Sequence, residues 1–270
     1  HPTFRKPNPA VDPENRNDSL TYHVGAVRNQ TDYFYKSSDA TVYCMELNAG
    51  TLVTMNDSSD VLEEVHVVVE DGEIVEINDG FADGEDVIDA SDDVVIPGLV
   101  NAHTHMYSLP IRGAPLDVSP QSFYENLTDI WWRVDEAFTE ETARTSAVAS
   151  VKEMLEGGVT TFCDNYSGPN TLPGGLKAVA EGVNQTPIRA MLAFETTARN
   201  SIEEAEAGIE ENERFIAEEE DDYENIEGHY CLHTLFTNTE ETVQDTVEHA
   251  VEDDRPIQIH LEEGLVDVHE

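Results

Sequence analysis

Basic residues are scarce in this chain. Its 270 residues contain 14 Lys and Arg against 57 Asp and Glu, which gives a formal net charge of −43. A charge of this sign repels nucleic acid and anionic membrane surfaces, and this excludes both as natural partners. A disordered acidic protein is excluded for most of the chain, because apolar residues make up 39% of it and recur in organised runs.

The shortage of positively charged residues also predicts that the protein works at a high salt concentration. Lys6, Lys36, Lys152 and Lys177 are the four lysines, whereas acidic runs such as residues 218–222 carry five carboxylates in succession. Near molar salt the Debye length falls to about 3 Å, and the repulsion within such runs is largely screened. We therefore predict a halophilic protein from a salt-accumulating cytoplasm.

Cysteines and membrane-spanning segments are also lacking. Cys44, Cys163 and Cys231 are too few and too scattered for a disulfide framework. No segment resembles a signal peptide or an apolar span long enough to cross a membrane. We expect a soluble, cytoplasmic protein.

Residues 1–44 differ in composition from the rest of the chain. They hold five basic and five acidic residues, so the whole net charge lies in residues 45–270, with 14 − 5 = 9 basic and 57 − 5 = 52 acidic residues. The stretch is rich in Pro, Asn and Ser and shows no sustained periodicity. We interpret it as a non-domain tail, translated upstream of a start at Met45. The alternative is a genuine extension that covers the barrel or a partner subunit.

Residues 45–95 predict a small β-domain. Short runs of alternating apolar and β-branched residues occupy 50–54, 64–70, 73–77 and 86–89, and Asp71-Gly72 separates the second run from the third. An Asp-Gly pair between two such runs is a β-hairpin signal.

Two histidines one residue apart, His103 and His105, follow this domain. The run 94–96 before them predicts a buried parallel strand, and small and polar residues after them predict a loop. Side chains at i and i+2 of a strand point to the same side, so both histidines can converge on one ion. The pair alone is a weak signal and needs further ligands at other strand ends.

From residue 96 to 270 the chain alternates strands with amphipathic helices. Expected strands at 159–164, 188–194, 229–232 and 257–261 follow the histidine strand and alternate with expected helices at 121–135, 140–156, 176–182, 202–219 and 240–252. This cadence predicts an incomplete α/β TIM barrel with its chemistry at the C-terminal strand ends. A doubly wound sheet is the alternative fold, but no Gly-rich phosphate loop follows any strand. A closed barrel needs eight strands, so we expect the chain to be cut short at its C-terminus.

The expected strand 257–261 supplies the rest of a metal site. Its His260 can join His103 and His105 as a third neutral nitrogen ligand and leave an open position for water. Glu263, three residues further on, is our candidate for the carboxylate that moves the proton, in preference to Glu262. His233 ends the preceding strand and could contact the substrate.

Other residues fall at similar rim positions without an assigned role, namely Asn165, Tyr166 and Glu195. Binuclear sites in barrels of this kind need a bridging lysine at a strand end. Lys152 and Lys177 both fall in expected helices, so a single divalent ion is favoured.

These motifs together resemble the amidohydrolase superfamily, in its cytosine deaminase, chlorohydrolase and guanine deaminase branch. The resemblance rests on Pro-Gly-Leu-Val-Asn-Ala-His-Thr-His at 97–105, on Ile-His-Leu-Glu-Glu at 259–263 and on His233 between them. The Trp-Trp-Arg-Val-Asp run at 131–135 and the Leu-His-Thr-Leu-Phe-Thr run at 232–237 are similar to SsnA-type aminohydrolases.

The resemblance implies a metal-dependent hydrolase that deaminates a nitrogen heterocycle. It implies His103, His105 and His260 as ligands of one divalent ion, zinc or iron with zinc favoured, with Glu263 as proton shuttle and His233 as a substrate contact. Family members carry one more histidine and a metal-binding aspartate, which we expect beyond Glu270. A chlorohydrolase, a cyclic amidase, or a truncated non-catalytic fragment with residual metal binding remain alternatives, and the sequence leaves a homodimer open.

Overall fold

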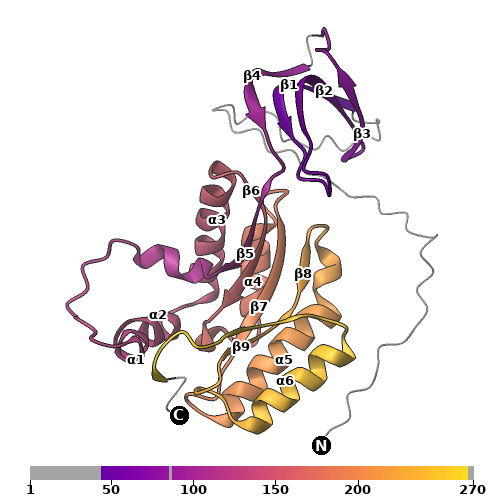
Figure 1. Cartoon of the computed structure of the whole chain (residues 1–270). Helices are drawn as coiled ribbons and strands as arrows, with labels where there is room; N and C mark the ends of the chain where they lie inside the picture. Colours follow the sequence, from indigo (N-terminus) through magenta and orange to yellow (C-terminus); the bar gives the residue numbers. More distant parts are fainter. Residues whose placement is uncertain (1–43, 85–86, 267–270) are drawn as a thin grey trace, which may run out of the picture. The chain divides into compact units, whose positions relative to one another are not determined.

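A computed structural model describes residues 44–84 and 87–266 (Figure 1). The described residues fall into two compact units, 44–97 and 98–266. The predicted tail, residues 1–44, lies outside the described residues except for Cys44. No helix in the described part of the chain is long and apolar enough to cross a membrane.

The first unit is a four-stranded sheet. Its strands pair in the order β3-β2-β1-β4, with β1 antiparallel to β2, β2 antiparallel to β3, and β1 parallel to β4. One face buries the alternating side chains of Leu47, Ala49, Val65 and Val67. The strand bounds are β1 Cys44–Val53, β2 Val61–Glu70, β3 Glu73–Asp79 and β4 Val87–Val95.

The structure corrects the prediction that the run 94–96 begins the histidine strand. Val94 and Val95 end β4 and pair with Thr51 and Leu52 of the first sheet. Val94 is 63% exposed, which is incompatible with a strand buried on both faces. Pro97 lacks a backbone N–H and so separates β4 from the next strand.

The second unit contains a parallel sheet in the order β10-β9-β7-β6-β5, with the short strand β8 beside β7. This curved sheet forms half of a TIM barrel, as the sequence predicted (Figure 1). The strands are β5 Leu99–Thr104, β6 Val159–Tyr166, β7 Arg189–Thr196, β8 Ile226–Gly228, β9 Tyr230–Thr234 and β10 Ile257–His260.

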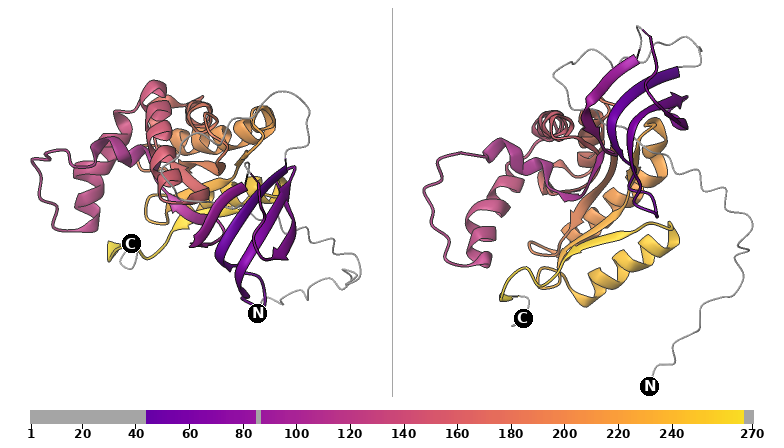
Figure 2. Two further views of the ribbon diagram at one scale, coloured as in Figure 1. Left: turned by 90° about the horizontal axis from the view of Figure 1, so that it is seen from above. Right: turned by 45° about the horizontal axis from the view of Figure 1, so that its top comes forward.

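Helices connect these strands and lie along one side of the sheet (Figure 2). A hydroxyl side chain begins each of α3, α5 and α6 by accepting a hydrogen bond from a backbone N–H in the first turn. Two glutamates follow each cap, where negative charge favours the positive end of the helix dipole. The helices are α1 Phe123–Asn126, α2 Trp132–Glu136, α3 Glu140–Glu156, α4 Gly175–Val183, α5 Ile202–Glu218 and α6 Glu240–Glu252.

Shorter helical segments complete the unit. A π-helical turn, η2, joins α1 to α2. The other segments are short 3₁₀ helices of three to six residues, and η1 directly follows His105. The bounds are η1 Met106–Ile111, η2 Leu127–Trp131, η3 Pro169–Thr171 and η4 Glu220–Asp222.

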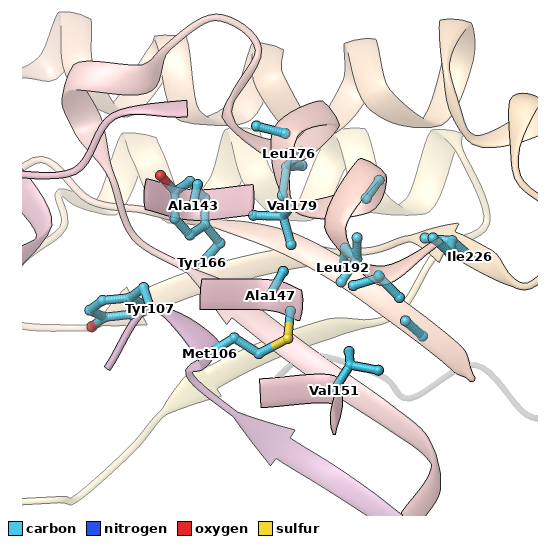
Figure 3. Close-up of a cluster of buried hydrophobic side chains, with 14 of the residues drawn as sticks. Met106, Tyr107, Ala143, Ala147, Val151, Tyr166, Leu176, Val179, Leu192 and Ile226 are labelled. Atoms are coloured by element: carbon cyan, nitrogen blue, oxygen red, sulfur yellow. The ribbon is translucent and has the colours of Figure 1, made fainter. Parts of the chain in front are cut away.

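The main hydrophobic core lies between the sheet and helices α3 and α4. Ala143, Ala147 and Val151 recur every four residues along α3, so they share the face that is buried. Figure 3 shows them beside Met106 from η1 and Leu192 from β7. This packing supports the chain immediately after His105.

His229 is buried in the same unit, between β8 and β9, and is 2% exposed. Its Nε2 lies 3.2 Å from Asn165 Oδ1, whereas its Nδ1 has no partner among the described residues. Burial, which disfavours the charged form, lowers the pKa of His229 to about 4. The ring is therefore neutral in the folded protein at neutral pH.

We predict that His229 contributes to acid destabilisation. In the unfolded chain this histidine takes up a proton near pH 6.5, whereas in the folded chain it does so only near pH 4. The contribution of neutral His229 to the free energy of unfolding is therefore fully present above pH 6.5 and is lost as the pH falls between these two values. In this range the free energy of unfolding changes by at most about 1.4 kcal/mol per pH unit because of His229. Urea unfolding with excess chelator, at pH values from 4.5 to 7, should show a shallower slope for His229→Gln. His249→Gln, which removes a partly exposed histidine of α6, is the control, and equal slopes for His229→Gln and the parent would contradict the prediction.

Candidate active site

Three histidines meet at the C-terminal ends of the barrel strands. His103 lies on β5, His105 directly follows it, and His260 is the last residue of β10. One ring nitrogen from each falls within a group whose members all lie within 4.8 Å of one another, so the three could hold a metal ion. The structure thus brings together the three residues that the sequence predicted as ligands.

Backbone carbonyls of neighbouring strands fix two of the rings. His105 Nδ1 donates to the carbonyl of Asn165 at 2.8 Å, and His260 Nδ1 donates to the carbonyl of His233 at 2.8 Å. Each ring then has an unprotonated Nε2, and these two nitrogens face each other at 3.1 Å. Two lone pairs at this distance repel unless a cation or a proton lies between them, and hydrogen bonding at Nδ1 is the usual orientation of metal-binding histidines. This donor set fits a divalent metal ion.

Asn165, at the end of β6, connects the third ring to this arrangement. Its side-chain Nδ2 lies 3.1 Å from His103 Nδ1 and donates to Gln258 Oε1 at 2.9 Å. Gln258 Oε1 also lies 3.4 Å from His103 Nδ1, and Gln258 Nε2 donates to the Ala102 carbonyl at 2.8 Å. The fully buried Asn165 therefore supports both histidines of the first strand.

Two buried carboxylates lie beside the histidines. Glu195, at the end of β7, is 2% exposed, and its Oε1 lies 3.6 Å from His105 Nδ1 and 3.8 Å from His260 Nδ1. Asp164 Oδ1 accepts a hydrogen bond from Met106 N at 2.7 Å and so holds the chain that follows His105. Burial raises the pKa of Glu195 to about 7 and that of Asp164 to about 8. A cation at the histidines would favour the charged form of Glu195.

A cavity of about 240 Å³ opens in front of the histidines. His105, His260, His233 and Glu263 all line it, whereas Glu262 does not. Hydrophobic and aromatic side chains from the segment 123–132 form another wall. The cavity places the predicted proton shuttle and the predicted substrate contact beside two of the three candidate ligands.

His233, on β9, is held as a neutral ring. Thr237 Oγ1 donates to the Thr234 carbonyl at 3.2 Å and therefore accepts from His233 Nδ1 at 3.0 Å. Burial, followed by electrostatic interactions with His260, Arg199 and His105, lowers the pKa of His233 to about 3. Its Nε2 is thus available as a hydrogen-bond acceptor.

An ion pair, Asp135–Arg199, also lines the cavity. The guanidinium donates to both carboxylate oxygens, with Nη1 and Nη2 each at 2.8 Å, and Ser167 Oγ donates to Oδ2 at 3.0 Å. The Trp132 ring lies 5.2 Å from the guanidinium carbon. Both charged side chains are almost fully buried, 1% exposed for Asp135 and 3% for Arg199.

Several of these residues have no predicted role from the sequence. Glu195 and Asn165 are predicted only as rim residues, and no sequence pattern assigns a role to Gln258, Asp164 or Arg199. The alternation of a strand places Gln258 on the same side as His260, two residues away, so this partner had a local signal. The others act through neighbours that are distant in sequence.

The chain is similar in sequence to known deaminases. A 5-methylthioadenosine/S-adenosylhomocysteine deaminase from Bacillus cereus (strain AH820) is 30% identical over 217 residues, which cover 79% of this chain and 48% of that protein. The corresponding protein from Bacillus thuringiensis (strain Al Hakam) is 29% identical over the same length. The chain spans about half the length of the curated relatives it matches.

Solved structures share the fold at low identity. Guanine deaminase from C. acetobutylicum with bound guanine superposes with a TM-score of 0.71 and 16% identity, over 83% of this chain and 54% of that one. Zinc-bound adenosine deaminase from Xanthomonas campestris gives 0.64 and 23%, over 80% and 49%. Atrazine chlorohydrolase from Arthrobacter aurescens TC1, complexed with zinc and atraton, gives 0.68 and 19%, over 83% and 55%.

The family model described as the amidohydrolase family matches residues 94–270. This confirms the resemblance inferred from the histidine motifs, while the finer similarity to SsnA-type proteins stays a prediction. The match covers more than half of the sequence and includes every candidate ligand, and the chain therefore belongs to the amidohydrolase family.

Proposed function

We propose that this chain belongs to a metal-dependent hydrolase of non-peptide C–N bonds, an aminohydrolase that releases ammonia from a nitrogen heterocycle. The observation that carries the proposal is the convergence of His103, His105 and His260, two of which line one cavity with Glu263 and His233. The names of its relatives, which include deaminases of adenine nucleosides and of guanine, support the same reaction class.

The three histidines would hold one divalent ion, for which we favour zinc over iron. Three neutral nitrogen ligands with an open position are typical of catalytic zinc sites, and two of the structural relatives are zinc complexes. When bound, the ion supplies Lewis acidity that makes a ring carbon and an attacking water more reactive.

Glu263 is assigned the proton transfers. Its carboxylate lies in the cavity lining and is exposed, so it can accept a proton from water and later deliver it to the amino leaving group. Water adds to the ring carbon, the C–N bond breaks, and ammonia leaves with the proton that Glu263 delivers. His233 Nε2 would accept a hydrogen bond from the heterocycle and orient it, because Nδ1 is engaged by Thr237.

Metal content tests the ligand assignment. We expect roughly one zinc or iron ion per chain in the parent protein and loss of most of it in His260→Ala, because two histidines hold an ion much more weakly than three. Elemental analysis after gel filtration measures this. His249→Ala, on helix α6, is the matched control and should retain the ion. Retention of the ion by His260→Ala would show that other residues bind it.

Glu263→Gln tests the proton shuttle. On the purine or triazine that gives the fastest ammonia release, kcat should fall by about 10²- to 10⁴-fold, because the amide cannot accept a proton, while metal content stays unchanged. Glu262→Gln removes the neighbouring exposed carboxylate, which does not line the cavity, and should retain activity. Equal rates for the parent and Glu263→Gln, or equal losses in the two variants, would contradict the assignment.

We also infer a salt-rich cytoplasm as the working environment. The support is the net charge of −43. The free energy of unfolding should rise between 0.1 M and 1 M potassium chloride, as the Debye length falls from about 10 Å to about 3 Å. Urea titration at both salt concentrations measures this, and an unchanged unfolding midpoint would contradict the inference.

A further inference from the structure

The cavity in front of the histidines has an unusual distribution of charge. Asp135, Glu195 and Glu263 line it, and Arg199 is the one Lys or Arg side chain among the described lining residues. The guanidinium of Arg199 is already engaged by both oxygens of Asp135 at 2.8 Å. No Lys or Arg side chain of the described wall is therefore free to pair with an anionic ligand.

This ion pair is held rigidly. Ser167 Oγ donates to Asp135, and the ring of Trp132 lies against the guanidinium. A bidentate pair that is nearly dry would have to break for Arg199 to bind a carboxylate, and Asp135 would then remain buried without its partner, at a large cost. The pair thus opposes anionic ligands because Asp135 already occupies the guanidinium of Arg199, and because freeing the guanidinium would leave a buried negative charge without a partner.

The same wall does offer hydrogen-bond donors. Arg199 Nε and Trp132 Nε1 are buried, belong to residues that line the cavity, and have no hydrogen-bond partner among the described residues. Buried donors normally find acceptors. An uncharged acceptor of a heterocycle, such as a ring nitrogen or a carbonyl oxygen, satisfies such a donor without disturbing the ion pair.

Aromatic side chains supply the remaining wall. Phe123, Trp131 and Trp132 come from the segment that contains the π-helical turn η2. Their flat apolar surfaces suit a planar ring, and π-helical turns are frequent at functional sites.

We propose that the Asp135–Arg199 pair makes this cavity selective for uncharged planar heterocycles that carry hydrogen-bond acceptors, and makes it reject ligands that carry a carboxylate. This selectivity rests on the proposed function, because it concerns the substrate of the same site. The pair is a specificity determinant rather than a catalytic group.

Tryptophan fluorescence provides a direct test. The chain has two tryptophans, and both line the cavity, so emission excited at 295 nm responds to a ligand bound there. Benzimidazole-5-carboxamide and benzimidazole-5-carboxylate are nearly equal in shape and differ in charge. We expect saturable quenching by the carboxamide and binding of the carboxylate that is weaker by about tenfold. The titrations use both metal-loaded and chelator-treated protein, which separates attraction of the carboxylate to the metal from its interaction with the wall.

Variants identify the cause of the preference. Asp135→Asn keeps a hydrogen-bonding partner for Arg199 but removes the negative charge, so it should strengthen carboxylate binding by about tenfold. Asp129→Asn removes a charge from the same segment outside the cavity lining and should change neither affinity. The double variant with Asp135→Asn and Arg199→Gln leaves no buried unpaired charge and should not gain carboxylate affinity. This variant keeps the test valid if Asp135→Asn alone does not fold.

Equal affinities of the parent for the two ligands, or no quenching by either, would overturn the proposal. So would equal carboxylate binding by the two asparagine variants when both fold. Neither probe carries an amino group on its ring, and the readout is binding. A protein that fails to release ammonia from any heterocycle can therefore still show the preference, and an active deaminase can still lack it.

Discussion

The candidate site depends on hydrogen bonds from histidine Nδ1 atoms to the backbone of the neighbouring strand. His105 donates to the Asn165 carbonyl and His260 donates to the His233 carbonyl, each at 2.8 Å. In a parallel sheet the C-terminal ends of adjacent strands lie side by side, so a ring at one strand end meets a carbonyl of the next. The same bonds set the tautomer that leaves Nε2 free, and the fold thereby prepares the ligands before any ion binds.

Much of this half-barrel could be predicted from the sequence because its signals are local. Alternation of strands and helices predicted the five main strands, and the i, i+2 spacing placed His103 and His105 on one side. The error at residues 94–96 arose because a short apolar run does not tell to which sheet it belongs. Pairing with Thr51 and Leu52, more than forty residues earlier in the chain, decides this. The short strand β8 was missed because three residues carry no periodicity.

The residues that support the site could not be predicted in the same way. Asn165 reaches His103 and Gln258, which are 62 and 93 positions away, and Glu195 lies against rings from two different strands. A single sequence gives these residues no local pattern, since their roles follow from the register of the sheet. Their burial distinguishes them from the many acidic and amide side chains on the surface: Asn165 is 0% and Glu195 is 2% exposed.

The shortage of basic residues affects the cavity as well as the surface of the chain. Arginines are few, and several of them are held by carboxylates, as in Arg199 with Asp135, Arg214 with Glu211 and Arg255 with Glu220. Burial keeps the pKa of Glu195 and Asp164 raised, and it raises the pKa of Asp135 as well, although Arg199 opposes that rise. A divalent ion at the histidines would bring a positive charge close to Glu195, whose Oε1 lies 3.6 Å from His105 Nδ1 and 3.8 Å from His260 Nδ1. Metal binding and the charge state of the barrel interior are therefore coupled, and an anionic ligand in the cavity would compete with Glu195 and Glu263 for the same positive charge.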